Sequence, residues 1–146
     1  MIPPFDETGN LPPGIHKATW GEVEARFSGS PRRAALALGL REALVVLRNA
    51  GCQTACIDGS FVTSKEEPGD FDVCWEARNV DPDALDPVLL RFSEGRRAQK
   101  ERFGGELFPA EALADPMGTR FLDYFQRDRN TGEPKGIIQI DLEDLA

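Results

Sequence analysis

Apolar side chains recur with the three-to-four-residue spacing of amphipathic helices in four segments of the chain. The first three segments open on a capping residue, or on a capping residue followed by proline, and two of them stop at glycine. The predicted helices cover residues 20–27, 31–50, 82–103 and 118–126.

Between these helices the spacing changes to the alternation that is typical of strands. Strands are predicted over residues 54–57, 70–75, 106–109 (as an edge strand) and 136–142. Because strands and helices alternate, the predicted fold class is α/β or α+β, a mixed sheet covered by helices in one domain. Residues 1–18 are rich in Pro and Gly and are expected to form an extended arm against that domain, which spans residues 19–146.

Composition narrows the class of protein without naming a chemistry. A chain of 146 residues suits one domain with a real core, and no apolar run reaches the roughly 20 residues of a membrane helix. The net charge of −8 argues against an extensive nucleic-acid surface. Three cysteines without a Cys-x-x-Cys pair, and an N-terminus without a secretory signal, predict a cytoplasmic protein with reduced thiols.

Three pieces of sequence carry candidate chemistry. Gly59-Ser60 follows an apolar strand, where a glycine lets backbone N–H groups approach an anion and the serine adds a donor. Asp70 and Asp72 are two residues apart on a predicted strand, so their carboxylates share one face and suit Mg²⁺. Asp141, near the end of the last predicted strand, is expected to add a third carboxylate from a neighbouring strand.

The order of these pieces resembles the signature of the DNA polymerase beta-like nucleotidyltransferase superfamily. An apolar strand, Gly-Ser, a spacer and Asp-x-Asp between apolar residues form that signature, and here they read Cys56–Ser60 and Asp70–Val73. The closest shape is the minimal, single-domain group, some of whose members act as antitoxins by transferring AMP to a partner toxin. The chain also resembles an uncharacterised bacterial family of that superfamily, in three segments: Leu11–His16, Asp58–Lys65 and Lys135–Ile138.

The resemblance implies a nucleotidyltransferase-like mixed sheet flanked by helices, and it implies a role for each site residue. Gly59 and Ser60 would contact the triphosphate, with Lys65 as the nearest cation, where many members have an arginine shortly after Gly-Ser. Asp70, Asp72 and Asp141 would hold two Mg²⁺ ions and act as the catalytic acids. The implied activity is Mg²⁺-dependent transfer of a nucleoside monophosphate from a nucleoside triphosphate to a hydroxyl acceptor, with release of pyrophosphate.

Several acceptors and one inactive alternative stay open at the level of sequence. The acceptor is expected to be a toxin-like partner protein, with a homodimer mate as a second source of acceptor surface. RNA or a small molecule is the alternative acceptor, and a binding module that keeps the fold without catalysis is the third hypothesis. His16, in the Pro-rich arm, is expected to serve packing or hydrogen bonding.

Overall fold

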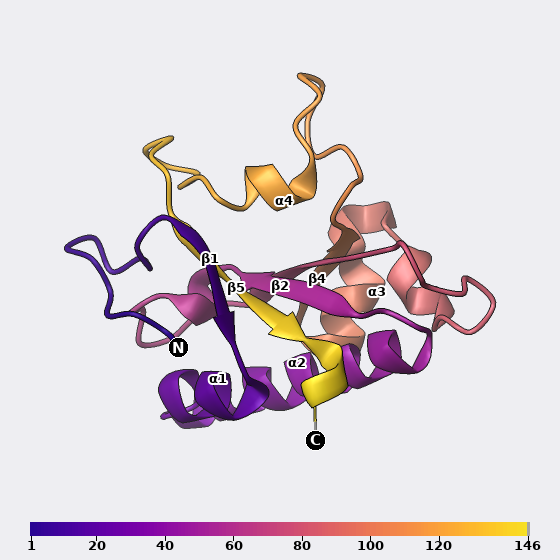
Figure 1. The fold of residues 1–146 in the computed structure, drawn as a ribbon, viewed down its shortest axis with the longest axis horizontal. Helices are drawn as coiled ribbons and strands as arrows, with labels where there is room; N and C mark the ends of the chain where they lie inside the picture. The colour runs from indigo at the N-terminus through magenta and orange to yellow at the C-terminus, as the bar shows by residue number, and fades with distance from the viewer. Residues whose placement is uncertain (146) are drawn as a thin grey trace.

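The computed structural model describes residues 1–145 and contains one five-stranded mixed sheet with its three longest helices on one face (Figure 1). The strands are β1 (Gly14–Ala18), β2 (Thr54–Asp58), β3 (Phe71–Trp75), β4 (Gly105–Pro109) and β5 (Gly136–Asp141), in the order β1-β5-β2-β3-β4. β2 is antiparallel to both of its neighbours, whereas the outer pairs β1–β5 and β3–β4 are parallel. The predicted α/β class is confirmed.

The helices are α1 (Trp20–Phe27), α2 (Pro31–Asn49), α3 (Ser93–Phe103) and α4 (Phe121–Tyr124). α1 begins at the predicted capping box, in which Thr19 and Glu22 each accept from the other's backbone N–H. Ser30 caps α2, and Gly51 follows its end with a φ of +103°. Among residues 1–145, no helix has the length and apolar character needed to cross a membrane.

The two faces of the sheet carry different side chains because strand residues alternate. One face packs with α1, α2 and α3 into the main core, which includes Leu40, Leu44, Ile57 and Val73. The other face carries a smaller cluster around Phe108, Phe125 and Cys74, which the segment from Ala110 to Lys135 covers (Figure 1). The side chains of the candidate site lie on this second face.

Two predicted helices are shorter in the structure. The segment expected to be helical over residues 82–103 forms a 3-10 turn at Pro87–Leu90 and then α3, whose first turn has left-handed backbone at Glu94, Gly95 and Arg96. Asp86 and Pro87 do start a turn, as their capping pattern predicts, but it stops at Leu90. The helix expected over residues 118–126 is the single turn α4.

The N-terminal arm belongs to the sheet. Its residues Gly14–Ala18 form β1, an edge strand that pairs in parallel with β5. Leu11 is fully buried, and Ile2 and Phe5 pack against the main core, whereas Ile15 is exposed. The Nε2 atom of His16 donates to the carbonyl of Pro12 at 2.7 Å, which agrees with the predicted hydrogen-bonding role.

Candidate active site

Several carboxylates lie side by side on the second face of the sheet, at one end of its strands. In the strand register Asp58 lies opposite Asp72, and Asp72 lies beside Glu106. Residues paired in register project to the same face, and Asp70 shares that face because it precedes Asp72 by two residues. Four carboxyl groups therefore gather where β2 ends and where β3 and β4 begin.

Three of these groups are placed to hold a metal ion. Asp70, Asp72 and Glu106 each offer one carboxylate oxygen, and these oxygens lie within 4.8 Å of one another. All three side chains are partly buried. Within residues 1–145, the carboxylates of Asp70 and Asp72 have no hydrogen-bond donor and no ion-pair partner, so no direct contact stabilises their ionised forms.

Burial and mutual repulsion disturb the titration of the pair. Burial, followed by the neighbouring carboxylates of Asp70, Asp58 and Glu106, raises the pKa of Asp72 from 3.8 to about 7. Burial and then the charge of Glu106 raise the pKa of Asp70. Perturbed carboxylates that share a cleft are typical of metal and catalytic sites.

Asp141 does not join this cluster. It pairs with Thr54 at the start of β2, whereas Asp72 pairs with Asp58 at its end, so about 13 Å of strand separates the two positions. Asp141 is exposed, and its side chain accepts from the backbone N–H of Glu143 at 3.1 Å. The prediction of Asp141 as the third carboxylate is wrong because β5 starts at the cleft and ends away from it.

The third carboxylate is Glu106, the second residue of β4. Its Oε2 atom accepts from Nε of Arg96 at 2.9 Å, and its Oε1 atom lies 3.1 Å from Nζ of Lys100. The left-handed turn at the start of α3 brings Arg96 to this carboxylate, and its guanidinium also lies 5.4 Å from the ring centre of Phe108. The sequence signal was an acid directly after Gly104-Gly105 at the start of a predicted edge strand.

The Gly-Ser pair shapes the backbone beside the carboxylates. Gly59 has a φ of +89°, and a Cβ atom there would lie 2.9 Å from the backbone nitrogen of Asp72. The hydroxyl of Ser60 donates to the carbonyl of Asp70 at 3.3 Å and accepts from the N–H of Gly69 at 3.2 Å. The turn that Ser60 opens has only three residues, so it offers no helix dipole of consequence to a phosphate.

Two arginines at the start of α2 hold the loop between Ser60 and Asp70. Arg33 is buried and donates to four carbonyls, those of Phe27, Phe61, Thr63 and Lys65. Arg32 donates to the carbonyls of Pro68 and Gly69. The loop is thereby fixed from its back, and the exposed side chain of Lys65 lines the cleft.

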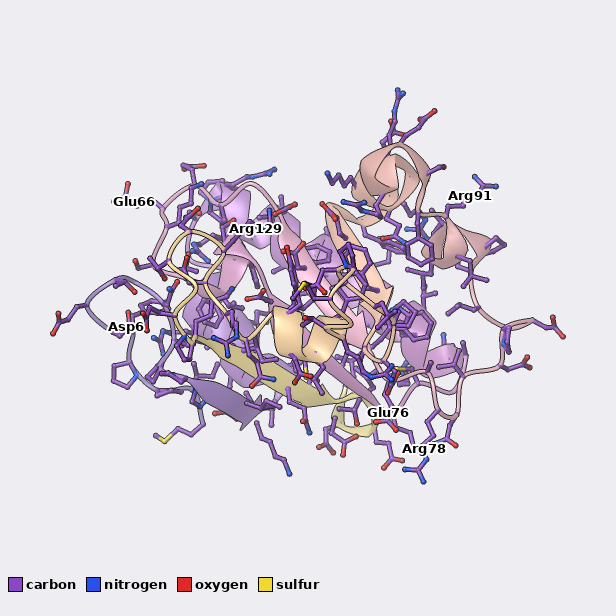
Figure 2. All side chains as sticks on the ribbon, turned by 90° about the horizontal axis from the view of Figure 1, so that it is seen from above. Asp6, Glu66, Glu76, Arg78, Arg91 and Arg129 are labelled. Atoms are coloured by element: carbon purple, nitrogen blue, oxygen red, sulfur yellow. The ribbon has the colours of Figure 1, made fainter. Side chains whose placement is uncertain are left out.

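Replacing Arg33 by methionine is expected to lower the free energy of unfolding by about 2–4 kcal/mol. Methionine keeps the apolar stem but leaves buried carbonyls without donors, which costs about 1–3 kcal/mol for each group that water does not reach. Urea unfolding measures the change. Arg78→Met, at an exposed arginine on the periphery (Figure 2), is the matched control and should stay within about 0.5 kcal/mol. Equal stability of the two variants would contradict the role of Arg33.

A buried ion pair lies next to the metal-binding group. Asp58 is 5% exposed, and its Oδ1 atom lies 2.5 Å from Nζ of Lys135. Burial raises the pKa of Asp58, and the charge of Lys135 opposes that shift. Because Lys135 precedes β5, this pair ties the end of the Ala110–Lys135 segment to the end of β2.

The cleft above the carboxylates has a volume of about 720 Å³, within the usual range for a small-molecule site. Its floor is formed by the carboxylates and the Gly59-Ser60 turn. Its other side is formed by the Ala110–Lys135 segment, with Tyr124 and Arg129 among the lining residues. In the view from above, Arg129 lies inside the outline of the molecule, whereas Arg91 and Arg78 lie at its periphery (Figure 2).

The comparisons with known proteins give a family and no activity. Residues 3–141 match the model of a protein family described as a family of unknown function, DUF6932. No curated protein and no solved structure matches the chain. Since the family model covers nearly the whole chain, this protein belongs to the DUF6932 family.

Proposed function

We propose that this protein is a Mg²⁺-dependent nucleotidyltransferase that moves a nucleoside monophosphate from a nucleoside triphosphate to a hydroxyl acceptor. The observation that carries the proposal is the group of Asp70, Asp72 and Glu106, whose oxygens lie within 4.8 Å of one another in a cleft beside Gly59-Ser60. The resemblance of the Gly-Ser and Asp-x-Asp segments to the polymerase beta-like superfamily supports the same activity.

The residues at the cleft fit a divalent cation. The carboxylates of Asp70 and Asp72 lie close together, and within residues 1–145 no cationic side chain contacts them. Hard oxygen ligands of this kind suit Mg²⁺. Asp70 and Asp72 would hold the first ion, and Glu106 would complete a site for the second. Bound Mg²⁺ would neutralise phosphate charge and lower the pKa of the acceptor hydroxyl.

The protein's own residues would position the reactants and move one proton. The acceptor oxygen attacks the α-phosphorus, the bond to pyrophosphate breaks, and the acceptor proton passes to the carboxylate of Glu106. Arg96 and Lys100 each pair with that carboxylate and hold it in place. Gly59 allows the backbone to pass close to Asp72, so the Gly-Ser turn and the carboxylates form one surface for the triphosphate.

We assign the acceptor hydroxyl to a partner protein, as in the antitoxin-like members that the sequence resembles. The net charge of −8 argues against a long RNA as the acceptor, because protein surfaces that bind RNA carry an excess of Lys and Arg. A small molecule, or a second copy of the chain, is the competing acceptor. A cytoplasmic location, where triphosphates and Mg²⁺ are abundant, belongs to the same proposal.

Mg²⁺ together with a nucleoside triphosphate is expected to raise the melting temperature. A ligand at 100 times its Kd adds about 2.7 kcal/mol of stability. Thermal unfolding with each of the four nucleoside triphosphates, with and without Mg²⁺, measures the shift, and Asp70→Asn should abolish it. If no triphosphate shifts the wild-type protein, the proposed function fails.

A further inference from the structure

Two exposed cations that line the cleft, Lys65 and Arg129, have charges that no ion pair within residues 1–145 takes up. Arg129 is exposed, and within the described residues 1–145 it makes no ion pair and donates no hydrogen bond. Other cations nearby are engaged: Lys135 pairs with a carboxylate, as do Arg96 and Lys100, and Arg127 donates to a carbonyl of its own loop. Arg129 is therefore available to a ligand.

Arg129 lines the same cleft as the carboxylates of Asp58, Asp70 and Asp72. Its charge lowers the pKa of Asp58, Asp70 and Asp72 and so opposes the effect of burial on each. It nevertheless contacts none of these side chains directly, and it lines the same cleft of about 720 Å³. An anionic ligand that reaches from the carboxylate-bound cation to the arginine would occupy this space.

Three hydrogen bonds to Asp128 stabilise the loop that carries Arg129. The Oδ1 atom of Asp128 accepts from the N–H groups of Asn130 at 2.8 Å and Thr131 at 3.2 Å. The backbone N–H of Gly132 donates to the carbonyl of Asp128 at 2.8 Å, which closes the loop. A loop fixed before binding loses less entropy when it takes up a ligand.

A turn of the N-terminal arm, residues Asp6–Asn10, connects this loop to the one after Gly59-Ser60. The side-chain amide of Asn10 donates to Oδ2 of Asp128 at 2.9 Å. The carbonyl of Gly9 accepts from the backbone N–H of Ser64 at 2.9 Å. The arm thus sets the distance between the two loops that border the cleft.

We propose that Arg129 binds the β- and γ-phosphates of the nucleoside triphosphate opposite Asp70 and Asp72, and that the Asp6–Asn10 turn positions it. The proposal rests on the proposed function, and it names the residue that selects a triphosphate over a monophosphate. A guanidinium suits this task because it offers several N–H donors in a plane to phosphate oxygens.

The test compares Arg129→Gln with Arg91→Gln, a matched change at another exposed arginine, outside the cleft (Figure 2). Calorimetry with Mg²⁺-ATP, Mg²⁺-tripolyphosphate and AMP measures the Kd of each probe. Arg129→Gln is expected to weaken Mg²⁺-ATP and Mg²⁺-tripolyphosphate about 10- to 100-fold and to leave AMP unchanged. Arg91→Gln should change each Kd less than about twofold.

Mn²⁺ binding without nucleotide, followed by electron paramagnetic resonance, separates this inference from the proposed function. Arg129→Gln should bind Mn²⁺ as the wild type does, because its partner is phosphate. Wild-type affinity of Arg129→Gln for Mg²⁺-ATP would overturn the inference and leave the proposed function standing. If Mg²⁺-tripolyphosphate binds and its binding depends on Arg129, but no nucleoside triphosphate binds, the proposed function is overturned and the role of Arg129 in binding phosphate stands. Binding of neither probe by wild-type protein overturns both.

Asn10→Asp tests the positioning role of the arm. The new carboxylate would face Asp128 and repel the loop that Asn10 now holds. Affinity for Mg²⁺-ATP should fall several-fold, in the same direction as for Arg129→Gln, while Mn²⁺ binding stays unchanged. Combining Asn10→Asp with Arg129→Gln should add little to the loss, because both changes remove the same contact. Fully additive losses would overturn the positioning role.

Discussion

Glu106→Gln is expected to reduce nucleotidyl transfer by about 10²–10⁴-fold, the range for loss of a group that moves a proton. Glutamine keeps the size of the side chain but accepts no proton at neutral pH and is a poor ligand for Mg²⁺. Self-labelling with a radiolabelled triphosphate, or labelling of the acceptor protein once it is known, measures the rate. Binding of the triphosphate should fall much less, because Asp70 and Asp72 remain.

Asp141→Asn is the matched control for that experiment. Asp141 lies at the far end of β2 from the carboxylate group, and its exposed side chain only caps the turn that follows β5. Asparagine also caps turns, so the activity and stability of this variant should equal those of the wild type. A loss of activity in Asp141→Asn with full activity in Glu106→Gln would contradict the placement of the third carboxylate.

The confusion of these two acids shows what alternation in a sequence determines. Ile138, Ile140 and Leu142 pack in the main core, as the pattern of the last strand predicts, so Asp141 was placed on the right face. The pattern says nothing about the end of the sheet at which a residue lies. That depends on strand order and direction. β3, β4 and β5 all begin at the cleft, so Glu106 near the start of β4 lies at the cleft, whereas Asp141 at the end of β5 lies away from it.

Local signals fixed the elements that need no distant partner. The capping box of α1, the serine cap and proline start of α2, and the Asp-x-Asp strand formed where the sequence predicts them. The Arg129 loop depends instead on Asn10, more than 100 residues earlier. The left-handed turn at the start of α3 likewise presents Arg96 to Glu106 on another element. Contacts of this kind have no periodic signature in a single sequence.

Asp72→Asn should stabilise the metal-free protein at neutral pH while it abolishes metal binding and transfer. Asp72 carries a charge that burial and three neighbouring carboxylates disfavour, and asparagine removes the charge but keeps the shape. A shift from 3.8 to about 7 sets a ceiling of about 4 kcal/mol, and water in the open cleft reduces the expected gain to about 1–3 kcal/mol. Such a gain at the expense of function is typical of active-site residues.

The pH dependence of stability is a second test that the ionised Asp72 carboxylate destabilises the folded protein. Between about pH 4 and pH 7, Asp72 is protonated in the folded protein and ionised in the unfolded chain, so unfolding releases a proton. The stability of the metal-free wild type should therefore fall as the pH rises through that window and then level off. Asp70 and Asp58, whose pKa values are also raised, add to the fall.

Urea unfolding in the presence of a chelator, at a series of pH values from 4 to 8.5, measures both effects. Asp72→Asn should show a flatter profile than the wild type, and its advantage should vanish near pH 4, where Asp72 is protonated in the folded protein. Asp141→Asn should follow the wild-type profile. With saturating Mg²⁺, the wild type should be more stable than Asp72→Asn above pH 7. The bound cation neutralises the charge of Asp72 in the wild type, whereas asparagine does not bind the cation. If Asp72→Asn is less stable than the wild type at pH 8 without metal, partners in the fold stabilise the Asp72 carboxylate. The case for a metal site with uncompensated negative charge would then fail.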